Sequence, residues 1–232
     1  MWSRNSGRFP RRIRPHGYGR RNYGSIVTQP SERLREQFGD IDIHLFDQLL
    51  RGRIVEGMRV LDAGCGAGRN LVYLVRAGFD VWGVDESANA IARVRGLVAN
   101  LTPRLGPEHF RSETVEAMSF DDDSMDVVVS SAVLHFAHDE EHWWAMVREM
   151  WRVLRPGGML FARLATTVGQ SGLRPLGGGR YIMPDGDERY LVNHEVLEDA
   201  TARLGGTLLD PLKSTVVHGL RSMGTWVVGK RA

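Results

Sequence analysis

The sequence has little cysteine and no long apolar run. One cysteine among 232 residues cannot form an intramolecular disulfide or a multi-thiol metal site, and we expect no metal. The longest apolar stretch, residues 127–134, is interrupted by two serines and is far too short to cross a bilayer. A chain of this length buries roughly 70% of its unfolded surface without a covalent staple. We therefore expect no disulfide scaffold, secreted protein or membrane protein, and we expect a cytoplasmic location.

Acidic residues are missing from the first 31 positions, where seven arginines lie. The formal net charge of +2 is therefore the sum of a basic N-terminal tail and an acidic remainder of the chain. The tail also lacks helical or strand periodicity, so we expect residues 1–30 to be disordered. Residues 1–25 could bind nucleic acid or another anion, order as a flap over an active site, or be a solvated extension without measurable function.

From residue 31 onward, strand-like and helix-like segments alternate, and they predict one domain over residues 31–232. Helices are predicted at 31–38, 43–53, 69–77, 87–101, 139–154 and 193–204. Strands are predicted at 59–63, 79–84, 109–114, 126–131, 159–164, 207–217 and 223–228. This order predicts a doubly wound, Rossmann-like α/β fold with a seven-stranded, mostly parallel sheet. The short connection at 218–221 predicts an antiparallel hairpin strand at the C-terminus.

A glycine-rich segment, residues 166–189, lacks either periodicity and is predicted to be irregular. Loops of this length in a compact domain are commonly lids or binding loops. We expect residues 166–192 to form a substrate lid, and the substrate contacts we expect there are Tyr181, Arg189 and Tyr190, with plain solvated loop residues as the alternative. His44, on the second predicted helix, is expected to cover the substrate site from the other side.

Three glycines at alternate positions, Gly64, Gly66 and Gly68, follow the first predicted strand and open a helix. Without Cβ atoms, they let the backbone approach a ligand closely. Ligands of open α/β sheets bind beyond the carboxyl ends of the strands, where this loop lies. A nicotinamide dinucleotide loop would need glycine in place of Arg69, and the Gly-Lys-Ser/Thr signature of a phosphate loop is absent. An ordinary tight turn is the alternative interpretation.

Two carboxylates flank this glycine loop. Asp62 precedes it, where a negative charge would repel a pyrophosphate but would suit an ammonium or a sulfonium group. Asp85 ends the second predicted strand, where a carboxylate can accept hydrogen bonds from two ribose hydroxyls. A ligand with a ribose, a positive end and no phosphate indicates S-adenosylmethionine.

The segment from Val60 to Asn70 resembles the first motif of class I S-adenosylmethionine-dependent methyltransferases, in particular the group known as methyltransferase type 11. Segments 113–120, 126–136 and 154–158 resemble the family's later motifs in the same order, so the resemblance covers about residues 40–230. It implies an EC 2.1.1 enzyme that releases S-adenosylhomocysteine. The cofactor-binding residues it implies are Asp62, Gly64, Cys65, Gly66, Asp85, Glu86, Thr114, Val115, Met118 and Ser131. Segments 68–70 and 186–190 are weakly similar to the tellurite-resistance and thiol branch, which acts on small molecules.

Several sequence motifs are absent, and their absence excludes some classes of methyl acceptor. The end of the fourth predicted strand, residues 130–133, lacks the Asn/Asp-Pro-Pro box of amino methyltransferases that act on nucleic acids. The only cysteine lies inside the glycine loop, which excludes pyrimidine C5 chemistry. A small-molecule O, N or S acceptor, methylated by in-line displacement, remains. His135 is the candidate catalytic residue, as a base or a substrate contact, with a locally hydrogen-bonded histidine as the alternative.

Two other function classes stay open. An RNA or protein methyltransferase would use residues 1–25 to hold its substrate. A non-catalytic S-adenosylmethionine-binding partner subunit would keep the glycine loop and transfer nothing. The sequence predicts no oligomeric state.

Overall fold

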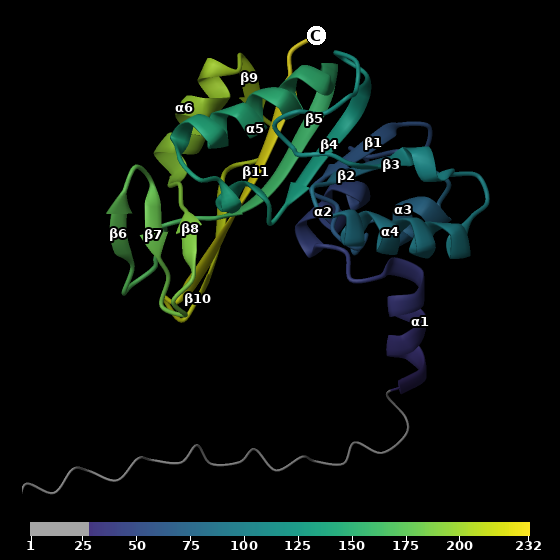
Figure 1. Cartoon of the computed structure of the whole chain (residues 1–232), viewed down its shortest axis with the longest axis horizontal. Helices are drawn as coiled ribbons and strands as arrows, with labels where there is room; N and C mark the ends of the chain where they lie inside the picture. Colours follow the sequence, from purple (N-terminus) through teal and green to yellow (C-terminus); the bar gives the residue numbers. More distant parts are fainter. Residues whose placement is uncertain (1–27) are drawn as a thin grey trace, which may run out of the picture.

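The central feature of the computed structural model, which describes residues 28–232 and their side chains from residue 32, is an eight-stranded sheet. The strand order is β10-β11-β5-β4-β1-β2-β3, and β9 pairs with β11 (Figure 1). The strands are β1 (Arg59–Ala63), β2 (Asp80–Asp85), β3 (Phe110–Ser112), β4 (Met125–Ser131), β5 (Leu154–Ala165), β9 (Gly206–Leu208), β10 (Lys213–Val217) and β11 (Arg221–Lys230). Strands β1 to β5 pair in parallel, whereas β9, β10 and β11 pair antiparallel. The predicted Rossmann-like, mostly parallel sheet with an antiparallel C-terminal hairpin is confirmed.

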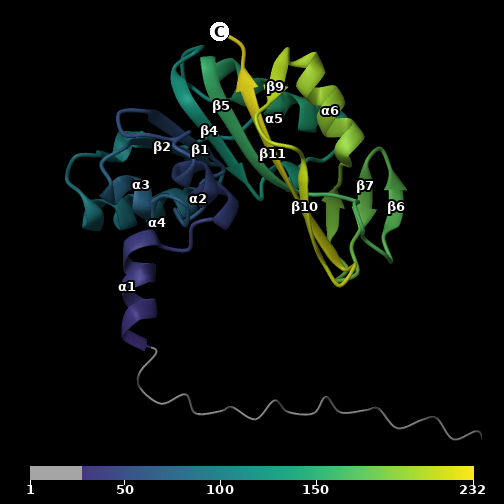
Figure 2. The same cartoon turned by 180° about the vertical axis from the view of Figure 1, so that it is seen from behind.

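Helices cover both faces of this sheet (Figures 1 and 2). The helices are α1 (Thr28–Phe38), α2 (Ile43–Leu50), α3 (Val72–Arg76), α4 (Ala88–Leu101), α5 (Glu140–Val153) and α6 (His194–Arg203), with short 3-10 turns η1 (Pro107–His109) and η2 (Leu134–Phe136). Neighbouring strand residues alternate between two cores: Leu61 packs with α5 and α6, whereas Val60 packs with α2, α3 and α4. This period of two buries both faces of the parallel strands. None of the described helices is both long and apolar enough to span a membrane.

The sheet has one strand more than the seven predicted, because the segment predicted as one strand at 207–217 is divided. Strand β9 ends at Leu208 and β10 begins at Lys213. Pro211 lies between them and has no backbone N–H to continue a ladder. The buried carboxylate of Asp210 forms ion pairs with Arg51 and Arg53, and the strand is interrupted at this point.

The prediction that residues 166–189 are irregular is wrong, because the segment contains most of a second sheet. Strands β6 (Arg174–Gly177), β7 (Arg180–Ile182) and β8 (Glu188–Tyr190) form a separate antiparallel sheet. The turn between β6 and β7 consists of glycines that all have positive φ. All four residues of β6 are exposed, so the strand lacks the alternation by which the sequence would reveal it.

The predicted disordered tail, residues 1–30, lies outside the described residues except for its last part. Thr28 already begins α1, so the helix starts earlier than residue 31. The proposed nucleic-acid contacts at residues 1–25 lie wholly outside the described residues.

Candidate active site

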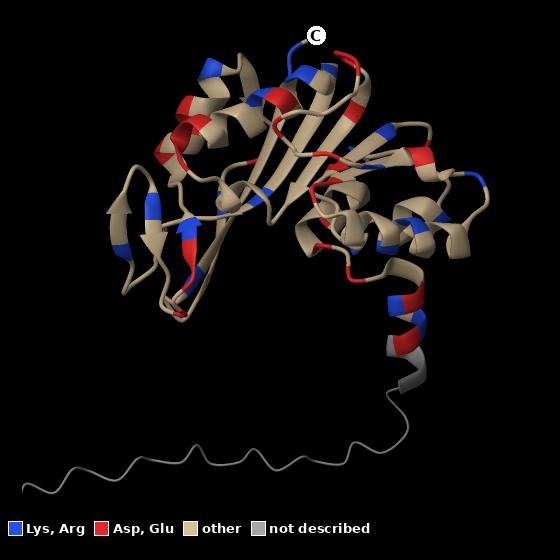
Figure 3. Cartoon of the chain, viewed as in Figure 1, with Lys and Arg blue, Asp and Glu red and all other residues tan. Residues whose placement is uncertain are grey.

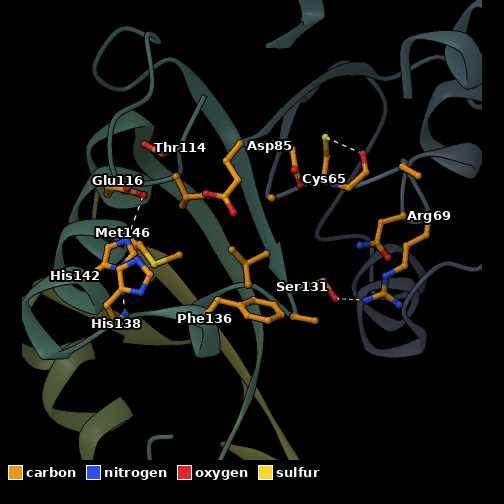
Figure 4. Close-up of a pocket in the computed structure, with 18 residues that line it drawn as sticks. Cys65, Arg69, Asp85, Thr114, Glu116, Ser131, Phe136, His138, His142 and Met146 are labelled. Atoms are coloured by element: carbon orange, nitrogen blue, oxygen red, sulfur yellow. Dashed lines mark hydrogen bonds and ion pairs between the residues drawn. The ribbon is translucent and has the colours of Figure 1, made fainter. Parts of the chain in front are cut away.

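A cavity of about 650 Å³ opens at the carboxyl ends of β1, β2 and β4 (Figure 4). Its volume lies within the range of roughly 300–1,000 Å³ that is usual for small-molecule sites. The residues that line it are Gly64, Cys65, Gly66, Ala67, Arg69, Asn70, Asp85, Glu86, Thr114, Val115, Glu116, Ser131, Ala132, Val133, Phe136, His138, His142 and Met146. All predicted cofactor residues except Asp62 and Met118 therefore meet at one cavity.

The glycine loop after β1 forms one wall of this cavity. Gly64 has φ +83°, and a Cβ atom there would lie 2.3 Å from Cγ2 of Val133. Gly66 has φ +54°, but a Cβ atom there would meet nothing within 4 Å. Gly64 is thus needed for close packing of the chain, whereas the backbone of Gly66 lies bare beside open space.

Asp85 is fixed at the end of β2 by two backbone donors. Its Oδ2 accepts a hydrogen bond from the N–H of Gly66 at 2.9 Å, and its Oδ1 accepts one from the N–H of Ser87 at 3.0 Å. A carboxylate oxygen has more than one lone pair, so both oxygens keep capacity for further donors. The carboxylate is therefore held in place at the cavity and can accept hydrogen bonds from ligand hydroxyls.

Asp62 lies behind the glycine loop and does not line the cavity. Its side chain is buried, and neither carboxylate oxygen has a hydrogen-bond partner among the described residues. Burial raises the pKa of Asp62 to about 7, although the positive charge of Arg69 and the nearby side-chain amide of Asn70 act in the opposite direction. An acid in this state is partly protonated near neutral pH and would be stabilised by a nearby cation.

The opposite wall carries residues that the sequence analysis did not select. His142 and Met146 lie four residues apart on α5, His138 comes just before this helix, and all three line the cavity. His142 Nε2 lies 3.5 Å from Oε2 of Glu116, which follows the predicted Thr114 and Val115 (Figure 4). The spacing of four between His142 and Met146, which places side chains on one helical face, is the signal that could have revealed these two residues.

Met118 and Cys65 are packing residues in this structure. Met118 belongs to the apolar core, and its N–H donates to Glu149. Cys65 lines the cavity but is buried, and burial raises the pKa of its thiol far above the usual range. A thiol in that state is a poor nucleophile, in line with its interpretation as a small buried residue.

A second cavity, of about 370 Å³, adjoins the first and shares Arg69, Ser131 and Ala132 with it. Arg69 Nη2 donates to Ser131 Oγ at 2.7 Å at this junction (Figure 4). The second cavity also includes His135 and Arg189, two of the predicted catalytic and substrate residues. It therefore brings part of the predicted substrate site next to the predicted cofactor site.

The hydrogen bonding of His135 defines its tautomer. The residue is 8% exposed, and Nδ1 of its ring accepts a hydrogen bond from the backbone N–H of Ala165 at 3.3 Å. Burial lowers the pKa of His135 to about 4, and the positive charge of Arg189 adds to this effect. The ring is therefore neutral at pH 7 with its proton on Nε2, so it can donate a hydrogen bond but has no free lone pair with which to act as a base.

The other predicted substrate residues lie elsewhere. Tyr181 and Tyr190 line a separate hollow beside α5, and Tyr190 stacks on Trp143 with a centroid distance of 6.2 Å. His44 is half-buried on α2 and lines neither of the two adjoining cavities. The structure thus brings Arg189 to the second cavity but does not bring these three side chains there.

The sheet order, the glycine loop and the acidic end of β2 are typical of α/β domains that bind nucleosides. Residues 61–162 match the family model described as a methyltransferase domain. These residues therefore form a methyltransferase domain that is similar to S-adenosylmethionine-dependent methyltransferases.

Similar proteins include a curated relative and two solved structures. The ubiquinone biosynthesis O-methyltransferase of Chelativorans sp. (strain BNC1) is 32% identical over 158 residues, which cover 65% of this chain and 59% of the relative. A methyltransferase of Methanosarcina mazei has a TM-score of 0.65 at 20% identity, with 79% of this chain and 97% of that chain covered. The 1,6-didemethyltoxoflavin-N1-methyltransferase of Burkholderia thailandensis has a TM-score of 0.63 at 17% identity, with 81% and 76% covered. The chain spans less than two thirds of the length of the first curated relatives it matches.

The residues present at the first cavity fit S-adenosylmethionine. The open space beside Gly66 leaves room for a ligand against the backbone, and Asp85 offers fixed acceptors for ribose hydroxyls. Asp62 does not line this cavity, so its buried carboxyl would favour a positively charged ligand through its charge and not by direct contact.

Proposed function

We propose that the protein transfers a methyl group from S-adenosylmethionine to an O, N or S atom of a small-molecule acceptor. The observation that carries this proposal is the cavity at the carboxyl ends of β1, β2 and β4, with Asp85 held at its wall by Gly66 and Ser87. The names of similar proteins support a small-molecule acceptor, since one is an O-methyltransferase of ubiquinone biosynthesis and another is a 1,6-didemethyltoxoflavin-N1-methyltransferase. S-adenosylmethionine, when bound, would supply a methyl group activated by its sulfonium.

The role of the protein in this reaction is to position the acceptor and to exclude water. Gly64, Cys65, Gly66, Thr114 and Val115 would hold the cofactor with Asp85, Glu86 and Ser131. The junction at Ser131 and Ala132 would place the acceptor beside it, because both cavities share these residues. Holding two reactants in a productive geometry supplies much of the rate enhancement of a bimolecular transfer.

The substrate lid proposed for residues 166–192 corresponds to β6, β7, β8 and their connections. Met183, Asp185, Asp187 and Arg189 from this segment line the second cavity, which supports the lid interpretation. His135 would then be a substrate contact that donates from Nε2 rather than a base. A cytoplasmic location and a role for the tail stay predictions.

The test is methyl transfer by wild type and by Asp85→Ala. We expect the Asp85→Ala variant to lose S-adenosylhomocysteine binding by at least about 10-fold, because two ribose hydrogen bonds to a charged group are lost. Calorimetry measures binding, and incorporation of labelled methyl into the small-molecule fraction of an extract measures transfer. Asp121→Ala, at an exposed site that does not line the cavity, is the matched control. Wild-type affinity in the Asp85→Ala variant would exclude this cofactor site.

A further inference from the structure

The second cavity is walled by basic side chains from four separate segments. Arg69 follows the glycine loop, Arg163 lies on β5, Arg189 on β8 and Arg221 at the start of β11. Basic segments of β5, β8 and the β10–β11 hairpin lie toward the same end of the sheet (Figure 3). These residues, which are far apart in sequence, therefore meet only in the folded chain.

Acidic residues neutralise two of these four arginines. Arg163 Nε lies 3.3 Å from Oδ2 of Asp42, and both side chains are nearly buried. Arg189 Nη2 lies 2.6 Å from Oδ2 of Asp187, which is mostly exposed. The remaining acid of the cavity, Asp185, is exposed, as are Arg69 and Arg221.

Arg69 and Arg221 have no carboxylate partner within ion-pair distance among the described residues. Arg69 donates to the hydroxyl of Ser131, a neutral group. Its positive charge acts on the buried acid Asp62, whose pKa of about 7 leaves it partly protonated near neutral pH. The cavity therefore keeps an excess of positive charge at the side that adjoins the cofactor site.

Neutral donors point to the same ligand chemistry. The Ser131 hydroxyl accepts from Arg69, so its own hydrogen is free to be donated. His135 is held as the Nε2–H tautomer by Ala165, and within the described residues its Nε2 makes no hydrogen bond. Guanidinium, hydroxyl and imidazole N–H groups that surround one space suit a ligand that carries only acceptors.

We infer that this cavity binds a carboxylate of the methyl acceptor, so that the proposed enzyme acts on a small carboxylic acid. Arg69 and Arg221 hold the carboxylate, while Ser131 and His135 orient it by hydrogen bonds. This inference deepens the proposed function and rests on it. It assigns a substrate class to the cavity and a specificity role to Arg221.

The test compares two probes of the same shape that differ in charge, benzoate and benzamide. Each is titrated into full-length protein saturated with S-adenosylhomocysteine, and binding is measured by ligand-observed NMR. We expect benzoate to bind at least about 10-fold more tightly than benzamide and to weaken as salt is added. We expect Arg221→Gln to weaken benzoate at least about 5-fold without changing benzamide.

Arg174→Gln is the matched control, because Arg174 is exposed on β6 and lines neither of the two adjoining cavities. Benzoate binding in the Arg174→Gln variant should equal that of wild type. Equal affinities for the two probes, no benzoate binding at about 20 mM, or an unchanged affinity in the Arg221→Gln variant would each overturn the inference. Calorimetric titration with S-adenosylhomocysteine distinguishes failure of this inference from failure of the proposed function. If S-adenosylhomocysteine binds but benzoate binds no more tightly than benzamide, only the carboxylate site is wrong. If S-adenosylhomocysteine does not bind, the cofactor site is wrong as well.

Discussion

At the scale of single residues, two glycines with positive φ allow the effect of a substitution on stability to be distinguished from its effect on ligand binding. Gly66 has φ +54° and Gly57 has φ +89°, and a Cβ atom at either position would meet nothing within 4 Å. Substitution by alanine should therefore cost each variant about 1 kcal/mol of stability through backbone strain alone. Only Gly66→Ala places a methyl group in the cavity, so we expect it alone to lose S-adenosylhomocysteine affinity, by at least about 10-fold.

Thermal unfolding and calorimetry on both glycine variants measure these effects. Gly57 precedes β1, at the end of the strand away from the cavity, which makes Gly57→Ala the control for strain. If Gly66→Ala and Gly57→Ala kept the same affinity, the backbone of Gly66 would not contact the ligand.

The sequence predicts residues of the site well where their role depends on local chain geometry. Asp85 and the glycine loop are predicted because strand ends and alternate glycines are local patterns. The tautomer of His135 depends on the N–H of Ala165, 30 residues away, and no local pattern contains that bond. For the same reason the sequence could not show that Tyr190 stacks on Trp143 rather than facing a substrate.

At the scale of elements, the small sheet of β6, β7 and β8 is attached to the cavity wall by a few side chains. Arg180 on β7 donates to the carbonyl oxygen of His138 at 3.1 Å and pairs with Glu188. We expect Arg180→Ala to speed amide hydrogen exchange over residues 174–190 several-fold and to leave β1 to β5 unchanged, since locally stabilised segments open independently.

Mass-spectrometric hydrogen exchange measures this difference. Arg174→Ala, on the exposed strand β6, is the control and should exchange as wild type does. Faster exchange throughout the chain would mean that the small sheet is part of the main cooperative unit.

The central strands were predicted from the sequence because burial on both faces leaves apolar runs, whereas the small sheet has no such pattern.

At the scale of the whole molecule, Asp210 joins the N-terminal helical layer to the C-terminal strands. Its carboxylate is 2.9 Å from Arg53 Nη1 and 3.2 Å from Arg51 Nη1, and it accepts from Gln48 Nε2 at 3.1 Å. We expect Asp210→Ala to lower the free energy of unfolding by about 2 kcal/mol, because both arginines are partly exposed and can be rehydrated. Urea denaturation at pH 7 measures the change.

The same residue gives a pH dependence with a definite sign. Burial acts to raise the pKa of Asp210, but hydrogen bonds from Arg53 and Gln48 outweigh it and lower the pKa. A lowered pKa contributes stability above the unfolded value of about 3.9 and loses it as the pH falls through the folded value. The stability difference between wild type and the Asp210→Ala variant should therefore shrink below about pH 4, and a constant difference down to pH 2 would contradict this account.

The position of Cys65 gives the unaltered protein a chemical reporter. It is the only cysteine of the chain and lies in the loop that lines the first cavity. Its thiol is buried, so a reagent such as a maleimide can reach it only when this loop opens. The labelling rate of the wild-type protein therefore reports how often this one loop opens. A ligand bound in the cavity should slow labelling, so the decrease in rate measures occupancy of the cavity without an engineered probe.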